Sequence, residues 1–223
     1  MDDPQSHFRS NIVGTERVLE ACRETDTRLG LVGTCMVYDM VDSGEGIDED
    51  HPMKPASPYA GTKLAAENLA ESYYHGYGLP VTRPFNTYGP FQKTGIASGV
   101  VSIFTNRDIE DEPLKIFGDG AQTRDLMYVT DTARFIVDAT FSEAAVGEVI
   151  NAGTGSDISI NELAELIASE GTEISHVEHH HPQSELQRLL CNPEKANELF
   201  GREPEVSPEE GVDRLRKWLR EKS

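Results

Sequence analysis

Apolar residues recur along this chain at the three- and four-residue spacing of amphipathic helices. The longest early stretch is residues 5–24, in which Phe8, Ile12, Leu19 and Cys22 mark one apolar face. The same spacing, together with capping residues such as Ser159, predicts further helices at residues 58–75, 99–109, 129–141, 159–169, 192–200 and from 207 onward. Helices are therefore expected along the whole length of the chain.

Short apolar runs between these helices predict strands at residues 28–33, 80–83, 114–117 and 148–151. Polar or glycine-containing segments at 39–56, 86–98 and 118–128 are expected to be loops. Strands that alternate with helices predict an α/β fold with a parallel sheet. Gly30 and Gly33 fall in the first of these strands, where glycine weakens packing, and we interpret them as a hint of relaxed constraint.

The helix at 58–75 carries the strongest candidate chemistry, because Tyr59 and Lys63 are four residues apart and share one helix face. A tyrosine phenol ordinarily ionises near pH ~10. A positive charge about 5 Å away favours the phenolate by roughly 3 kcal/mol at an effective dielectric constant of ~20. The pair therefore predicts a tyrosine that acts as a base.

Three further motifs surround this pair in order along the chain. Thr34 ends the first predicted strand, 25 residues before Tyr59, and the other motifs are Arg83-Pro-Phe-Asn-Thr-Tyr-Gly-Pro90 and Gly118-Asp-Gly-Ala-Gln-Thr-Arg-Asp-Leu-Met-Tyr-Val129. Together they resemble the extended short-chain dehydrogenase/reductase family, in its NAD-dependent nucleotide-sugar epimerase/dehydratase branch. The resemblance covers nearly the whole chain.

The resemblance implies a role for each motif. Tyr59 is similar to the catalytic base, Lys63 to its electrostatic partner that also binds the cofactor ribose, and Thr34 to the residue that holds the reacting sugar oxygen. The substrate-binding residues implied are Thr34, Asn86, Arg124 and, as a substitute for a missing arginine contact, Arg188. The cofactor implied is NAD, bound in part by Tyr59 and Lys63.

The fold implied is a partial doubly wound, Rossmann-like parallel sheet with a small C-terminal lobe that binds the sugar nucleotide. Residues 1–85, completed by parts of 129–152, are expected to form the C-terminal half of the NAD-binding domain, and 86–223 mainly the nucleotide-sugar lobe. No glycine pair in the sequence is part of the G-x-G-x-x-G or G-x-x-G-x-x-G turn that holds a dinucleotide pyrophosphate. A fragment, a misassigned start and a degenerate relative all explain this.

Epimerisation at sugar C4 by transient oxidation is the activity that the resemblance favours, as in a UDP-glucose 4-epimerase. The alternative is a 4,6-dehydratase of the dTDP-glucose type, whose members place an Asp-Glu pair after the catalytic threonine. Cys35 and Met36 stand there in this chain and cannot do that acid–base work. A truncated, non-catalytic protein that binds a sugar nucleotide or a partner is a third hypothesis.

The net charge of the chain limits the classes of partner that it can bind. Asp and Glu number 39 against 20 Lys and Arg, a net charge of −19. This excludes the basic footprint that nucleic-acid binding requires. The excess of acidic residues suits a high-salt cytoplasm, and an ordinary acidic protein of a mesophile is the alternative. No apolar run reaches the ~20 residues of a membrane span. The three cysteines, none closely spaced, indicate a reducing cytoplasm without structural disulfides.

His176, His179, His180 and His181 lack an acidic or cysteine partner at metal-site spacing, so no metal site is expected. Members of the family commonly pair as dimers through two helices, which match residues 5–24 and 58–75. The resemblance therefore implies a homodimer.

Overall fold

The computed structural model describes residues 3–39, 46–77, 81–92, 99–178, 187–201 and 203–222. Its helices are α1 Pro4–His7, a π-helical turn Phe8–Val13, α2 Gly14–Thr25, α3 Pro58–Tyr77, α4 Val100–Ile109, α5 Val129–Phe141, α6 Ile160–Ile167, α7 Glu194–Phe200 and α8 Pro208–Lys222, with 3₁₀ turns at Cys35–Val37 and Glu143–Ala145. Its strands are β1 Leu31–Val32, β2 Val81–Pro84, β3 Asn86–Tyr88, β4 Leu114–Phe117, β5 Thr123–Tyr128, β6 Val149–Ala152, β7 Asp157–Ser159, β8 Ile174–Val177 and β9 Arg188–Leu189.

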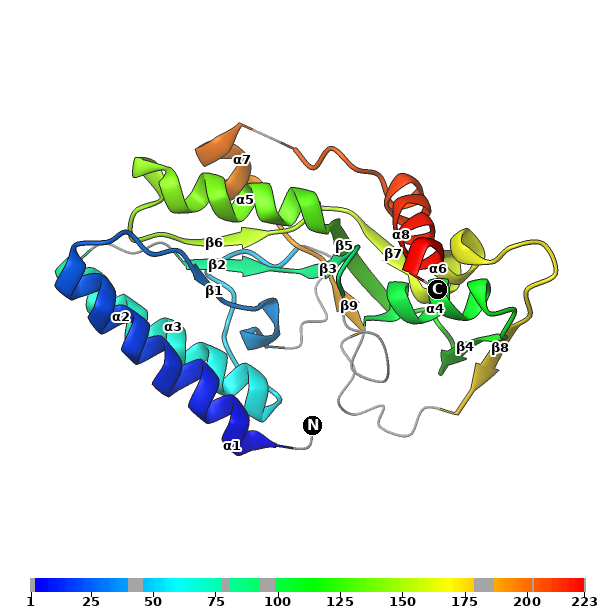
Figure 1. The fold of residues 1–223 in the computed structure, drawn as a ribbon, viewed down its shortest axis with the longest axis horizontal. Coiled ribbons are helices and arrows are strands. Elements are labelled where there is room, and N and C mark those ends of the chain that lie inside the picture. The colour runs from blue at the N-terminus through cyan, green and yellow to red at the C-terminus, as the bar shows by residue number, and fades with distance from the viewer. Residues whose placement is uncertain are drawn as a thin grey trace.

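The first lobe is a three-layer sandwich around a parallel sheet in the order β1-β2-β6. Helices α2 and α3 lie together along one face of this sheet, and α5 and α7 lie on the other (Figure 1). Leu19 and Ala70 are buried between the first pair of helices, and Ala139, Ile150 and Ala196 are buried on the opposite face. Helices on both faces of a parallel sheet confirm the predicted α/β class.

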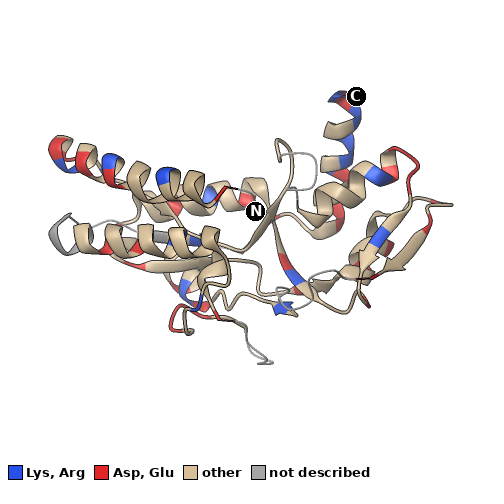
Figure 2. Ribbon diagram, turned by 90° about the horizontal axis from the view of Figure 1, so that it is seen from below, with Lys and Arg blue, Asp and Glu red and all other residues tan. Residues whose placement is uncertain are grey.

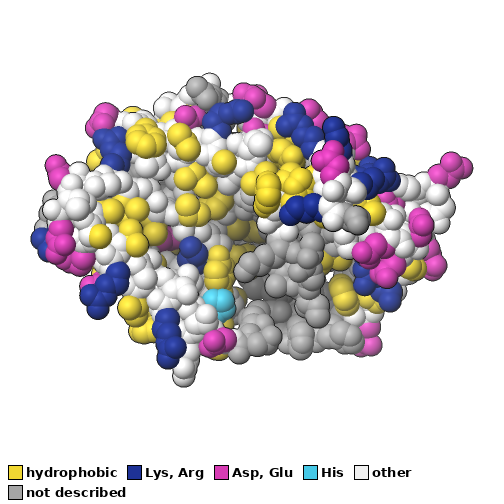
Figure 3. All heavy atoms as spheres, viewed as in Figure 1, with side chains coloured by type: hydrophobic (Ala, Val, Ile, Leu, Met, Phe, Trp, Pro, Cys, Tyr) yellow, Lys and Arg dark blue, Asp and Glu magenta, His cyan; other side chains and the backbone are white. Residues whose placement is uncertain are grey.

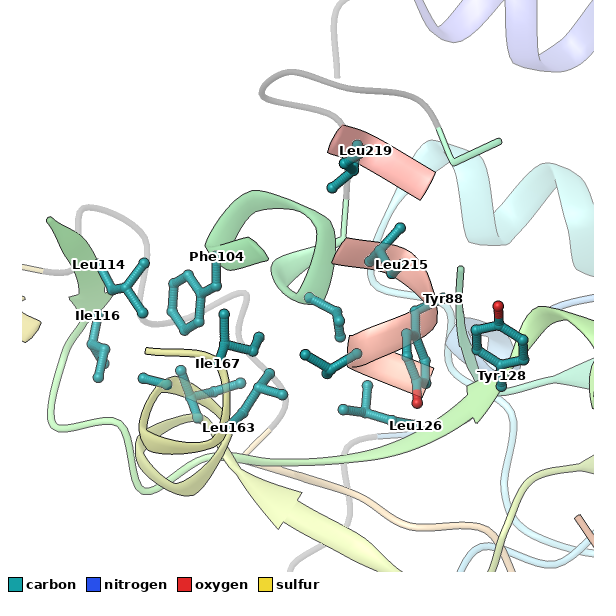
Figure 4. Close-up of a cluster of buried hydrophobic side chains, with 14 residues drawn as sticks. Tyr88, Phe104, Leu114, Ile116, Leu126, Tyr128, Leu163, Ile167, Leu215 and Leu219 are labelled. Carbon is teal, nitrogen blue, oxygen red and sulfur yellow. The ribbon is translucent and has the colours of Figure 1, made fainter. Parts of the chain in front are cut away.

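The second lobe holds the largest apolar core. Strand β5 pairs in parallel with β3 and β9 and antiparallel with β7, while β4 pairs in parallel with β8. Side chains from α4, α6 and α8 converge on these strands (Figure 4). The fully buried members of this core include Leu114, Ile116, Leu163, Ile167 and Leu215. This core fixes the position of the strands that carry the candidate binding residues.

Capped helices were predicted well, and polar strands were not. Helix α6 begins with the expected capping box between Ser159 and Glu162, and α3 begins at Pro58. Residues 118–128 were expected to be a loop, which is wrong because β5 runs from Thr123 to Tyr128. Strand β3 likewise falls within the expected loop 86–98. The polar residues of both segments hid their strand character.

The first helix also differs from its prediction. Its backbone widens into a π-helical turn at Phe8–Val13, which interrupts the regular α-helical spacing. Leu19 is buried, but Phe8 is 51% exposed. Only part of the predicted apolar face is therefore buried within the chain.

Acidic residues outnumber basic ones in the sequence, and the ribbon shows where both lie (Figure 2). Figure 2 shows acidic positions spread over the whole ribbon, with several basic positions close together on the C-terminal helix α8. On the face shown in Figure 3, hydrophobic side chains form patches between the charged ones. No helix in the described ranges is long and apolar enough to cross a membrane.

Candidate active site

Tyr59 and Lys63 lie on the first turns of α3, as the sequence predicts. Ser57 caps this helix by accepting a hydrogen bond from the backbone N–H of Ala60 at 3.2 Å. The ammonium of Lys63 donates to the carbonyl of Val32 at 2.8 Å. Burial lowers the pKa of Lys63, and the nearby carboxylate of Glu67 opposes this effect. The contact with Val32 fixes the start of α3 against the end of β1.

Thr34 lies two residues beyond the end of β1 and is buried, with 7% of its surface exposed. Its Oγ1 accepts a hydrogen bond from the backbone N–H of Met36 at 3.3 Å and so caps the 3₁₀ turn. Lys63 contacts the chain two residues before Thr34. Lys63 thus reaches the carboxyl end of β1, close in sequence to Thr34, and sheets of this class carry their sites at that end.

The N-terminal helix supports Tyr59 through contacts that the sequence did not indicate. The ring of His7 packs edge-on against that of Tyr59, with 5.6 Å between centroids. Asn11 donates to the hydroxyl of Thr62 at 3.0 Å, and that hydroxyl donates to the carbonyl of Tyr59 at 2.9 Å. The π-helical turn Phe8–Val13, which contains Asn11, has no pattern in the sequence that predicts it.

A buried polar network lies behind this group. Arg83 pairs with Glu67 at 2.6 Å and donates to the hydroxyl of Tyr38 at 2.8 Å. Tyr38 donates in turn to Asn151 of β6 at 2.8 Å. Burial raises the pKa of Tyr38 to about 12, so its phenol stays protonated and acts as a donor. The network joins α3, β2 and β6 to the segment that follows Thr34.

Two glycines of the first strand have a packing function that the sequence interpretation missed. A side chain at Gly33 would overlap Oε1 of Glu67, and one at Gly30 would overlap the hydroxyl of Thr140. Glycine at these positions lets α3 and α5 approach the strand closely. The two residues therefore reflect a constraint rather than its loss.

A cavity of about 460 Å³ opens in the second lobe. Its lining is mostly apolar, with the polar side chains of Asn86, Gln92, Gln122, Arg124 and Lys115. The side-chain N–H₂ of Asn86 is buried and makes no hydrogen bond within the described part of the chain. An amide donor without a protein acceptor, beside a cavity, fits a ligand that brings the acceptor.

Asn86 and Arg124 are thus brought together at one cavity, whereas Arg188 is not among the residues that line it. Arg188 pairs with Asp157 at 2.8 Å, and this hydrogen bond lowers the pKa of the Asp157 carboxyl. The role of Arg188 in substrate binding stays a prediction. Gln92, Gln122 and Lys115 line the cavity without having been singled out in the sequence.

The two residues after Thr34 differ in exposure. Cys35 is 4% exposed, and burial raises the pKa of its thiol to about 12. Met36 is 37% exposed and has no titratable group. A neutral, buried thiol is a poor acid or base near neutral pH. Neither residue supplies the acid–base pair of a dehydratase.

The metal prediction is only partly covered by the structure. No group of three potential metal-ligating side chains occurs among the residues that the structure describes. His176 lies beside the carbonyl of Gly118 at 3.0 Å. His179, His180 and His181 fall outside the described residues.

Comparison of the sequence with known proteins identifies relatives of this chain. Residues 1–153 match the profile of the NAD-dependent epimerase/dehydratase family. The UDP-glucose 4-epimerase of Mycolicibacterium smegmatis is 34% identical over 234 aligned positions, which cover 100% of this chain and 72% of that protein.

Comparison with solved structures identifies proteins of the same fold. Pal from Bacillus thuringiensis is 52% identical with a TM-score of 0.94, over 100% of this chain and 72% of that chain. UDP-glucose 4-epimerase from Thermotoga maritima, solved with UDP-glucose, is 29% identical with a TM-score of 0.91, over 99% and 72% of the respective chains.

Proposed function

Because the chain belongs to the NAD-dependent epimerase/dehydratase family, we propose that it carries the catalytic residues and substrate lobe of a nucleotide-sugar 4-epimerase. The observation that carries this proposal is the contact between Lys63 and the carbonyl of Val32. Lys63 shares α3 with Tyr59, and Val32 ends the strand two residues before Thr34, which supports a common site for the three side chains. A base and a hydrogen-bonding hydroxyl at one point are what the oxidation of a sugar hydroxyl requires.

Each side chain then has a proposed task. Tyr59 takes the proton from the C4 hydroxyl, while Thr34 holds that oxygen. Lys63 stabilises the phenolate through its positive charge. Asn86 and Arg124 bind the diphosphate of the nucleotide, because a guanidinium matches phosphate oxygens with two parallel hydrogen bonds. The cavity beside them is large enough and apolar enough to take the nucleoside.

The cofactor of the family is NAD, and part of its site fits the residues present. An ammonium has three N–H donors, and the structure shows one of those of Lys63 bound to Val32. Two donors therefore remain for the ribose hydroxyls, beside the half-exposed phenol of Tyr59. When bound, NAD supplies the hydride acceptor. The pyrophosphate is held in this class of fold by a glycine-rich turn, which the sequence does not contain.

Dehydration is the second candidate, and the state of Cys35 argues against it. A dehydratase needs an acid and a base next to the threonine, and the Cys35 thiol stays neutral and buried. A non-catalytic binding protein is the third candidate. It shares the cavity with an epimerase and differs only in turnover.

Calorimetric titration of the chain with UDP-glucose tests the proposal at its binding step. We expect binding that weakens about tenfold or more in Arg124→Gln, because the variant loses a charged contact to phosphate. The matched control is Arg220→Gln, in the last turn of α8 and not among the residues that line the cavity. Absence of binding to the unaltered chain, or equal affinity in Arg124→Gln, would reject the assignment of the cavity.

Two further features belong to the proposal. The net charge of −19 supports a high-salt cytoplasm as the working environment, since salt screens self-repulsion. Thermal melting in dilute and molar salt tests this, and an unchanged midpoint would contradict it.

We also propose that the protein forms a homodimer through α2 and α3, which lie side by side on one face of the sheet (Figure 1).

A further inference from the structure

The turn after β3 contains a backbone conformation that its side chain makes costly. Gly89 has φ of 141°, and a side chain there would approach Cγ1 of Val129 to 2.5 Å, so glycine is required. Phe91 has φ of 67°, in the left-handed region that bulky residues avoid. Glycine would adopt this conformation without strain. The phenyl ring at position 91 therefore needs a reason beyond the turn itself.

The ring of Phe91 is held by the C-terminal helix. It is 81% exposed, and its centroid lies 5.2 Å from that of Trp218 on α8. The ammonium of Lys222, one turn further along, lies 4.2 Å from the Trp218 ring and 5.2 Å from the Phe91 ring. Both distances are within the range of cation–π attraction. We call these three side chains the aromatic clamp.

The residue after Phe91 reaches the cavity. Gln92 lines it, and Oε1 of Gln92 accepts a hydrogen bond from Ser102 on α4. A side chain at Gly99, at the start of the same helix, would approach Nε2 of Gln92 to 2.8 Å. Gln92 therefore has little room to move once the backbone of Phe91 is fixed. Asn86 lies at the start of the strand that leads into this turn.

We propose that Phe91 is a positioning residue for substrate binding, and that the aromatic clamp holds the Gly89–Gln92 turn so that Gln92 faces the bound sugar nucleotide. This inference rests on the proposed function of the cavity. It adds α8, through Trp218 and Lys222, to the elements that determine affinity. Replacement of Phe91 by glycine relieves the strained backbone but removes the ring contacts with Trp218 and Lys222, so a packing role alone predicts a change in stability without a change in UDP affinity.

Calorimetric titration of the full chain with UDP, together with thermal melting, tests the inference. Phe91→Gly is expected to bind UDP about tenfold more weakly, while a cooperative melting transition shows that the variant is folded. Phe91→Tyr keeps the ring and is expected to stay within about twofold. Phe141→Ala is the matched control, since Phe141 is 72% exposed at the end of α5.

A double-mutant cycle shows whether Phe91 acts through Gln92. If it does, Gln92→Ala weakens UDP binding in the unaltered chain but has little additional effect in Phe91→Gly. Additive losses, or unchanged UDP affinity in Phe91→Gly, would overturn the inference while leaving the proposed function intact. Failure of the unaltered chain to bind millimolar UDP would overturn both.

Discussion

The guanidinium of Arg83 lies 2.6 Å from the carboxylate of Glu67, and each side chain is only 4% exposed. Glu67 is four residues beyond Lys63 on the same helix, and Arg83 begins the motif that leads to Asn86. The ion pair thus connects the helix of the proposed base to the strand that precedes the cavity. One carboxylate oxygen of Glu67 has no hydrogen-bond partner in the described part of the chain, so Arg83 is essential to its charge balance.

Arg83→Met is expected to lower the free energy of unfolding by about 3–5 kcal/mol, because it leaves the Glu67 carboxylate buried without its cation. The double variant Arg83→Met/Glu67→Leu removes both charges and should recover most of that loss. Urea denaturation of both variants measures this. A single variant that loses less than ~1 kcal/mol would show that water reaches the pair.

A second prediction concerns acid. Asp108 of α4 accepts hydrogen bonds from Ser169 and Thr172 and pairs with Arg216. Burial favours its neutral form, but these partners outweigh burial and lower the pKa of Asp108. Its ionised form therefore stabilises the fold at pH values above the unfolded pKa of ~3.9, and this contribution is lost as the pH falls through the lowered folded value.

Asp108→Asn should accordingly reduce the free energy of unfolding by about 2 kcal/mol at pH 7, since hydrogen bonds to a charged group are the stronger kind. The difference from the unaltered chain should shrink as the pH falls below ~4. Urea denaturation at a series of pH values measures this. A difference that is independent of pH would mean that the charge of Asp108 is not what stabilises the fold.

The proposed dimer gives a third prediction. Phe8, Val13 and Val18 are between 40% and 51% exposed along the N-terminal helix, an apolar surface next to α3. Val18→Glu is expected to convert a dimer to a monomer, because the buried interface would receive an unpaired charge. Light scattering decides the mass. Val137→Glu on α5, at a side chain that is 54% exposed, is the control that should keep the dimer.

The cofactor gives a fourth prediction. The chain should bind NAD weakly or not at all while it binds UDP-glucose, because the pyrophosphate of NAD lacks its glycine turn. Calorimetric titration with both ligands under one set of conditions makes the comparison. A micromolar dissociation constant for NAD would mean that other residues of this chain hold the pyrophosphate.

The parts of the fold that were foreseen are those with local signals. Pro58 and the pair Ser159 and Glu162 mark helix starts because they satisfy or remove backbone N–H groups near their own position. The helix that carries Tyr59 and Lys63 was also predicted from a local signal. Their helix spacing alone brings them to one face.

Features that depend on distant residues were missed. Strand β5 was not predicted because it contains the polar residue Asp125. The structure buries this side chain completely, and its carboxylate accepts hydrogen bonds from Thr154, Gly155 and Cys191. Gly33 was misread because Glu67, which occupies the space of its missing side chain, lies 34 residues away in the sequence. Periodicity describes neighbours along the chain and cannot register such contacts.

The central claim is C4 epimerisation with Tyr59 as the base, and its most direct test is product analysis by NMR and mass spectrometry. The chain would be joined to a glycine-rich strand–turn–helix segment from the family and incubated with NAD and UDP-glucose. We predict the C4 epimer at unchanged mass, and a loss of turnover of about 10²–10⁴-fold in Tyr59→Phe with UDP-glucose binding preserved. A product lighter by one water, or full turnover in Tyr59→Phe, would contradict the claim.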